Sequence, residues 1–117
     1  GVTNPIDLVE LAQLVGENTH EFLQMMSPIF LEDTKNILQK LGVAVQGQDS
    51  PEIHHAAHTL KGSSASMGMT TLSQLCRELE MMAKEEKLAK AAPKLAQIRV
   101  ECDRVEAALN KMVETAV

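Results

Sequence analysis

Apolar residues recur at every third or fourth position over much of this chain, which is the spacing of one face of an α-helix. The repeat is clearest in two segments of the C-terminal half. Their apolar positions are Leu72, Leu75, Cys76, Leu79 and Met82 in the first, and Leu95, Ile98, Cys102, Val105, Leu109 and Met112 in the second. Thr70 or Thr71 can cap the first segment, and Pro93 can open the second. The pattern predicts helices over residues 71–89 and 93–115.

The N-terminal half predicts three further helices, over residues 6–15, 19–46 and 51–67. The first is short. Pro5 stands near its start and Gly16 just past its end, which are the positions these residues favour at helix boundaries.

One proline lies within the predicted helix over residues 19–46, and another starts the predicted helix over residues 51–67. Pro28 interrupts the longer one, so that either the helix kinks there, the interpretation we favour, or Ser27 caps a new helix. The run GQDSPE separates this helix from the next. Gly47 can close the first helix, Ser50 can cap the second, and Pro51 suits its first position.

Four long amphipathic helices with short connections predict an antiparallel four-helix bundle, preceded by one short helix. The composition agrees, because 44% of residues are hydrophobic but only 2% are aromatic, and helix-forming residues dominate. A chain of 117 residues suits one domain with one core. We therefore expect an all-α fold in which residues 1–117 form a single domain.

Charge and hydropathy argue against two kinds of partner. The formal net charge is −5, and the sequence has neither a basic stripe for a phosphate backbone nor an aromatic pair for base stacking. No apolar run approaches the roughly 20 residues of a membrane span. Cys76 and Cys102 lie far apart within apolar stripes, which indicates reduced core thiols. We expect a soluble, cytoplasmic protein without nucleic-acid or membrane contact.

Three of the four histidines fall in one segment, HHAAHTLKGSSASMG, residues 54–68. At about 100° per residue, the apolar stripe of this helix is centred near Leu60. His58 lies about 160° from that centre, and His55 about 140° from it. The sequence therefore predicts that His58 faces solvent.

The neighbours of His58 suggest a chemical role for it. Lys61 follows at i+3, where its ammonium can reach a group attached to the ring. Gly62, at i+4, costs about 1 kcal/mol relative to Ala in a helix interior, and it leaves the ring open to another molecule. A neutral imidazole beside a cation suits phosphoryl transfer. The plainer alternative is an ordinary solvated histidine.

Metal binding is a further alternative for this segment. His54 and His58 have the i, i+4 spacing of two ligands on one helix face. A third ligand is not evident, because His55 points elsewhere. We therefore expect no metal site, and the roles of His54 and His55 stay open.

The segment AHTLKGSSASMG, residues 57–68, together with LSQLCRELE, residues 72–80, resembles the histidine-containing phosphotransfer (HPt) domains of multistep phosphorelays. The resemblance implies that His58 is phosphorylated, that Lys61 stabilises the phosphoryl group, and that Gly62 provides access. Ala65 and His55 are candidates for the same access and docking surface.

Some relatives in this family carry a polar side chain on the following helix that touches the histidine or its phosphate. In an antiparallel hairpin, residues near 79–80 lie level with His58. Glu80 is the nearest polar candidate, with Arg77 and Lys84 one turn to either side. A carboxylate there would orient the ring but repel a phosphate. Met81, outside the core stripe, can extend a docking patch.

The resemblance implies a phosphoryl carrier with no catalytic activity of its own, because the chain has no glycine-rich ATP loop. Its partners would be response-regulator receiver domains, which bring their own Mg²⁺, and a hybrid sensor histidine kinase; the chain needs no cofactor and is expected to be a monomer. Two alternatives remain. One is a structural or adaptor bundle, and the other is a histidine kinase dimerisation domain, for which this chain is too short.

Overall fold

The computed structural model describes residues 4–114, with side chains up to Met112. This part of the chain is helical and contains no strand. The α-helices are α1 (Leu8–Val15), α2 (Thr19–Gln46), α3 (Ser50–Ser66), α4 (Thr70–Lys84) and α5 (Ala91–Glu114). Two short 3-10 turns, η1 (Gly16–Asn18) and η2 (Leu88–Lys90), precede α2 and α5.

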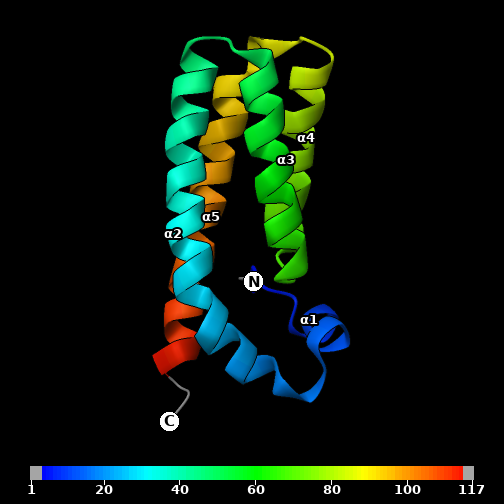
Figure 1. Cartoon of the computed structure of the whole chain (residues 1–117), viewed down its shortest axis with the longest axis vertical. Coiled ribbons are helices and arrows are strands. Elements are labelled where there is room, and N and C mark those ends of the chain that lie inside the picture. Colours follow the sequence, from blue (N-terminus) through cyan, green and yellow to red (C-terminus); the bar gives the residue numbers. More distant parts are fainter. Residues whose placement is uncertain (1–3, 115–117) are drawn as a thin grey trace.

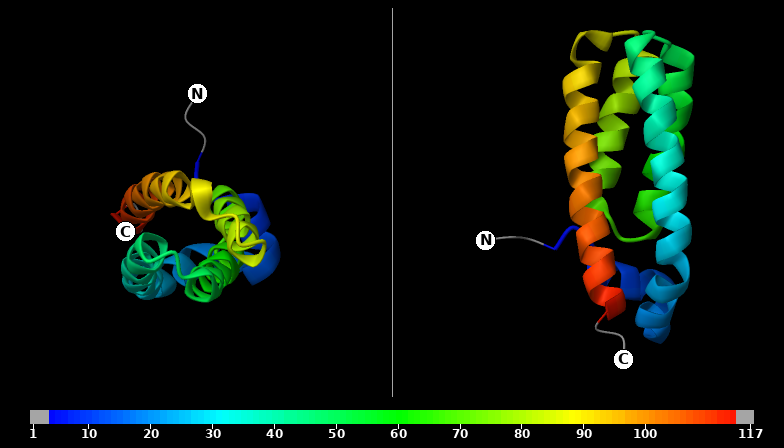
Figure 2. Two further views of the ribbon diagram at one scale, coloured as in Figure 1. Left: turned by 90° about the horizontal axis from the view of Figure 1, so that it is seen from above. Right: turned by 90° about the vertical axis from the view of Figure 1, so that its left-hand side faces the viewer.

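The four long helices form an antiparallel bundle (Figure 1). α2 packs against α3 and α5, and α4 packs against the same two helices, which closes the ring seen from above in Figure 2. The molecule is elongated, with principal extents of 45 × 28 × 22 Å. The predicted all-α four-helix bundle is confirmed.

The core is built from the apolar stripes that the sequence pattern marks. Ile53, Leu60, Leu72, Leu79 and Ile98 are fully buried. Because each helix contributes one stripe, its opposite face is exposed and mainly polar, with single exposed apolar side chains such as Val43 and Val100. None of the helices in the described part of the chain is long and apolar enough to span a membrane.

α2 is one helix, with Pro28 inside it. Figure 1 shows that its N-terminal part turns away from the bundle axis. Proline has no N–H to donate and crowds the preceding turn, which bends a helix. Ser27 is buried, and its hydroxyl donates to the carbonyl of Leu23 instead of capping a helix. The alternative in which Ser27 starts a new helix is therefore wrong.

The start of α3 differs from the expected cap by one residue. Asp49 is the N-cap, and its Oδ1 accepts a hydrogen bond of 3.2 Å from the backbone N–H of Glu52. Ser50, the predicted cap, is the first helical residue, with Pro51 after it. A carboxylate at this position also meets the positive end of the helix dipole, which favours Asp over Ser.

The start of α4 is set by burial rather than by a capping side chain. Met69 occupies the N-cap position and is fully buried, so the expected caps Thr70 and Thr71 fall inside the helix. The hydroxyl of Thr70 instead donates to Glu10 Oε2 at 3.0 Å. Packing of Met69 in the core therefore outweighs the local preference for threonine at the cap.

α4 ends at Lys84, earlier than the predicted residue 89. Glu86 adopts a positive φ of 56°, and its N–H donates to the carbonyl of Ala83. The N–H of Lys87 donates to the carbonyl of Met82 at 2.8 Å, which completes a Schellman motif. Because Glu86 takes the place usually held by Gly, no glycine marks this helix end in the sequence.

Two further helix starts differ from expectation. α1 begins at Leu8 rather than residue 6, because Asp7 caps it by accepting from the N–H of Glu10 at 2.9 Å. α5 begins at Ala91, two residues before Pro93. Proline is tolerated there because the first-turn N–H groups have no partner within the helix.

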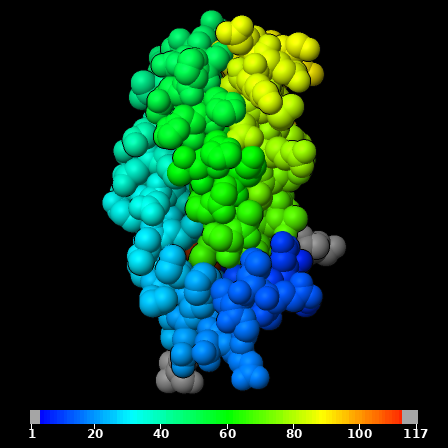
Figure 3. Space-filling model, turned by 45° about the vertical axis from the view of Figure 1, so that its right-hand side comes forward, coloured from blue at the N-terminus to red at the C-terminus, as the bar shows by residue number. Residues whose placement is uncertain are grey.

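α1 lies across the turn between α3 and α4. The N–H of Asp7 donates to the carbonyl of Gly68 at 2.7 Å. Gly68 has a φ of +71°, and a Cβ placed on it would lie 2.9 Å from the carbonyl oxygen of Asp7. Figure 3 shows α1 covering this end of the α3 and α4 face. Only glycine permits both the turn and the close approach.

Candidate functional site

His58 lies on the solvent side of α3. Its side chain is 64% exposed, whereas Leu60, two residues later, is fully buried. This difference follows from the helical angle between the two positions. The predicted exposure of His58 is confirmed.

Glu80, from α4, holds the His58 ring. His58 Nδ1 and Glu80 Oε2 are 2.6 Å apart, and only 10% of the Glu80 side chain is exposed. A carboxylate can only accept, so Nδ1 carries the proton and donates it. The lone pair is then on Nε2, the ring nitrogen that Glu80 does not contact. The contact therefore orients the ring and selects the tautomer.

Lys61 binds the other oxygen of the same carboxylate. Its Nζ lies 2.8 Å from Glu80 Oε1, and its side chain is 28% exposed. Lys61 is therefore not a free surface cation, because its ammonium pairs with a carboxylate from the next helix. One of its three N–H groups is used in this bond, and the remaining two can serve a further acceptor.

The two donors govern the protonation of Glu80. Burial acts to raise the pKa of this carboxyl, but the hydrogen bonds and charges of Lys61 and His58 outweigh it, and the pKa lies below its ordinary value. Glu80 is therefore an anion at neutral pH. It balances the charge of Lys61 and accepts from both neighbours at once.

Gly62 leaves space beside His58. A Cβ at Gly62 would have no atom within 4 Å, so the glycine is not required by packing. An open hollow between α3 and α4 is lined by Gly62 together with Lys61 and Glu80. The other lining residues are Glu10, Ala65, Thr70, Ser73, Gln74, Arg77 and Met81.

The remaining candidate residues for the docking surface divide into two groups. Met81, Arg77 and Ala65 are exposed and line the hollow, as a docking surface requires. Lys84 and His55 are exposed but are not among its lining residues. Of the three polar candidates on α4, Glu80 is the one that contacts the His58 ring.

His54 stacks on His58. The two ring centroids are 6.2 Å apart, and the planes differ by 5°. The described residues contain no cluster of three side chains suited to hold a metal ion. The i, i+4 spacing of His54 and His58 therefore brings their two rings into contact on one face of α3.

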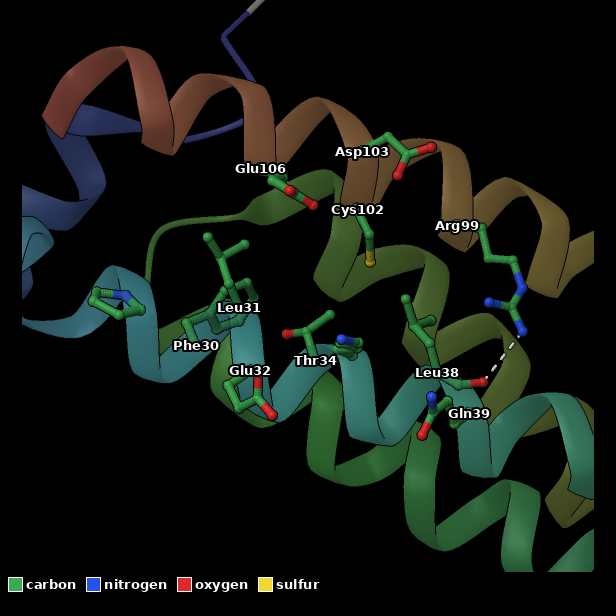
Figure 4. Close-up of a pocket in the computed structure, with 12 residues that line it drawn as sticks. Phe30, Leu31, Glu32, Thr34, Leu38, Gln39, Arg99, Cys102, Asp103 and Glu106 are labelled. Atoms are coloured by element: carbon green, nitrogen blue, oxygen red, sulfur yellow. Dashed lines mark hydrogen bonds between the residues drawn. The ribbon is translucent and has the colours of Figure 1, made fainter. Parts of the chain in front are cut away.

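A second hollow lies between α2 and α5, away from the histidine (Figure 4). Thr34 and Cys102 face each other across it, and Arg99 Nη2 donates to the carbonyl of Leu38 at 3.2 Å. The Thr34 hydroxyl is buried and has no hydrogen-bond partner among the described residues. Burial raises the pKa of the Cys102 thiol to about 12, so this thiol is not a reactive nucleophile at neutral pH.

Two residues that line the hollow between α3 and α4 had not been singled out from the sequence. Glu10 reaches the hollow because α1 folds back over the α3–α4 turn, a long-range contact without a local signal. Ser73 Oγ donates to the backbone carbonyl of Lys61 at 3.3 Å and so ties α4 to α3 beside the site. The only indication of this contact in the sequence is that Ser73 lies in the first turn of the predicted helix over residues 71–89.

The described part of the chain is thus an all-α bundle in which a carboxylate of α4 orients the exposed ring of His58 on α3, an arrangement that suits a helical phosphotransfer domain. The chain belongs to the Hpt domain family, whose sequence model matches residues 25–108. It is thus a histidine phosphotransfer domain, the kind of protein that serves as an intermediate in multistep phosphorelays.

Individual relatives agree with this assignment. The sensor protein TorS of Escherichia coli K12 is 43% identical over 74 residues, covering 62% of this chain and 8% of TorS. Histidine-containing phosphotransfer protein 1 of Arabidopsis thaliana is 25% identical over 95 residues, covering 80% of this chain and 62% of that protein. The chain spans less than two thirds of the length of either relative.

The fold matches a solved structure over nearly its whole length. The crystal structure of histidine-containing phosphotransfer protein B (HptB) from Pseudomonas aeruginosa PAO1 superposes with a TM-score of 0.84. The two chains are 29% identical, and the match covers 97% of each.

Proposed function

We propose that this domain accepts a phosphoryl group on Nε2 of His58 from a receiver-domain aspartyl phosphate and passes it to the aspartate of another receiver. The observation that carries this proposal is the 2.6 Å contact between His58 Nδ1 and Glu80 Oε2 on a ring that is 64% exposed. It leaves the lone pair of Nε2 available on the accessible side of α3.

The proposed step needs no proton transfer. Nε2 attacks phosphorus in line, the bond from phosphorus to the aspartyl oxygen breaks, and its electron pair remains on the aspartate. Nδ1 keeps its proton throughout. Mg²⁺ held by the receiver would neutralise charge on the transferring group, so this chain supplies the nucleophile and part of the electrostatic environment.

Lys61 and Gly62 have separate roles in this proposal. The ammonium of Lys61, one turn from His58, offers its two remaining N–H groups to the phosphoryl oxygens. Gly62 keeps the approach open, because no neighbouring atom lies within 4 Å of its missing Cβ. The exposed side chains of Met81 and Arg77 border this approach and are candidates for contact with the receiver.

The relatives support receiver domains as partners, since their names include a sensor protein and a phosphorelay regulator from Schizosaccharomyces pombe. We place the exchange in the cytoplasm and assign the domain as a monomeric carrier without an ATP site of its own. A hybrid sensor histidine kinase is a suitable source of the phosphoryl group.

The acceptor can be tested by labelling the chain with a purified receiver that has been phosphorylated with acetyl phosphate. The label should be acid-labile and base-stable, as phosphohistidine is. His58→Gln should abolish it, whereas the matched controls His54→Gln and His55→Gln should keep most of it. Undiminished labelling of the His58 variant would contradict the proposal.

A further inference from the structure

We propose that Glu80 is a positioning residue for the second half of the relay: its negative charge keeps the Nδ1 proton on the phosphorylated ring and so makes phospho-His58 an efficient donor. The inference rests on the proposed function, and it concerns the charge of the phosphorylated ring, on which the release of the phosphoryl group depends.

The charge of the ring changes when Nε2 gains a phosphoryl group. The attacking ring is neutral, with a proton on Nδ1 and a lone pair on Nε2. After the bond from Nε2 to phosphorus has formed, the ring still holds the Nδ1 proton and carries a formal positive charge. Glu80 Oε2, 2.6 Å from Nδ1, is in place to balance this charge.

The Nδ1 proton decides what leaves in the next step. When phosphorus is transferred to an aspartate, the bond to Nε2 breaks and its electron pair returns to the ring. A ring that has kept the proton leaves as neutral imidazole, whereas a ring that has lost it must leave as an imidazolate anion, a far poorer leaving group. A fixed carboxylate that retains the proton therefore favours onward transfer.

The setting of the carboxylate suits this role. The Glu80 side chain is only 10% exposed, so its charge is screened less by water than that of a surface carboxylate. Among the described residues, the ionisable groups in contact with the ring or with Glu80 are His54 and Lys61, both on α3. The thiol of Cys76, one turn earlier on α4, also interacts electrostatically with Glu80. Lys61 keeps Glu80 ionised, and its ammonium offsets the repulsion between this carboxylate and a phosphoryl group.

Glu80→Gln separates charge from hydrogen bonding, because the amide oxygen can still accept from Nδ1. The matched control is Glu78→Gln on the same helix, since Glu78 pairs with Lys94 at 3.0 Å and not with His58. We expect Glu80→Gln to donate the phosphoryl group to a receiver roughly five- to tenfold more slowly than wild type in mildly alkaline solution. Acceptance from a receiver should slow as well, because both directions share one transition state, in which the ring carries part of the positive charge that Glu80 balances. The deficit should shrink as the pH falls, because solvent then protonates the ring.

If Glu80→Gln folds poorly, a measurement on the wild-type chain tests whether Glu80 keeps the Nδ1 proton on the phosphorylated ring. The chain is phosphorylated with phosphoramidate, and the phosphohistidine signal is followed by ³¹P NMR as a function of pH. The ring of phospho-His58 should keep its proton to a higher pH than free phosphohistidine does. Titration at the same pH as the free compound, or below it, would overturn the inference.

Equal donation rates in wild type and Glu80→Gln would also overturn it, as would a deficit of the same size at every pH. These outcomes differ from a failure of the proposed function. If the proposed function itself were wrong, the wild-type chain would take no label on His58 from any phosphorylated receiver.

Discussion

Replacing Gly62 should make the protein more stable and less active. A Cβ at this position meets no atom within 4 Å, and the residue lies inside α3, so Gly62→Ala gains helix propensity without a clash. The gain is about 1 kcal/mol. For a domain of this size, that corresponds to a rise of about 4 °C in Tm.

The functional effect should appear with a larger side chain. Gly62→Gln also favours the helix, but its side chain would project from the turn that follows His58, where a receiver must approach. In-line transfer requires close and exact placement of the reacting atoms, so we expect transfer to slow by roughly tenfold or more. Stability and activity would then change in opposite directions.

Gly68→Ala is the matched control for stability. Gly68 has a φ of +71°, and its added Cβ would lie 2.9 Å from the carbonyl oxygen of Asp7. This variant should lower Tm, because the turn and the contact with α1 both become strained. The assays are thermal unfolding followed by circular dichroism, and time courses of phosphoryl transfer from a purified receiver.

Two results would refute the reasoning about Gly62. A fall in Tm for Gly62→Ala would show that the glycine is needed for packing or for a backbone conformation. Normal transfer by Gly62→Gln would show that the space beside His58 is not the route of approach.

Three further predictions concern the Lys61–Glu80 ion pair and the buried thiols of Cys76 and Cys102. Lys61→Ala should reduce the free energy of unfolding by about 1 to 2 kcal/mol in urea titrations and slow transfer, because the buried carboxylate of Glu80 loses its half-buried partner. Lys61→Arg should retain part of both the stability and the transfer rate. Because the pKa of Glu80 is lowered in the folded state, its stabilising effect is present at neutral pH and is lost as the pH falls below about 4; urea midpoints should show a smaller loss on acidification in Glu80→Gln. Burial raises the pKa values of Cys76 and Cys102 to about 12, so a thiol reagent at neutral pH should label them rapidly only after unfolding.

Several features of the helices were predictable because they depend on local geometry. A rotation of about 100° per residue places His58 opposite Leu60 whatever the rest of the chain does. The apolar stripes likewise define which face of each helix is buried, and four such stripes require a bundle. For these reasons the fold class and the exposure of the histidine could be predicted from the sequence.

Helix ends were less predictable, because neighbours in space compete with local preferences. Thr70 is a better N-cap than Met69 by propensity, but burial of Met69 in the core outweighs a cap worth about 1 kcal/mol. The stop after Lys84 uses Glu86 at positive φ, where a sequence pattern would call for glycine.

The four helices, the exposure of His58 and the open space at Gly62 can be inferred from the chain alone, since each depends on residues within one or two turns of a single helix. The contacts of Glu80 with both His58 and Lys61 depend instead on how α4 packs against α3. Glu80 lies 22 residues from His58, and a shift of one residue in the register of α4 against α3 would turn its carboxylate away by about 100°. That register is set by core packing along the whole length of both helices, which no local pattern specifies.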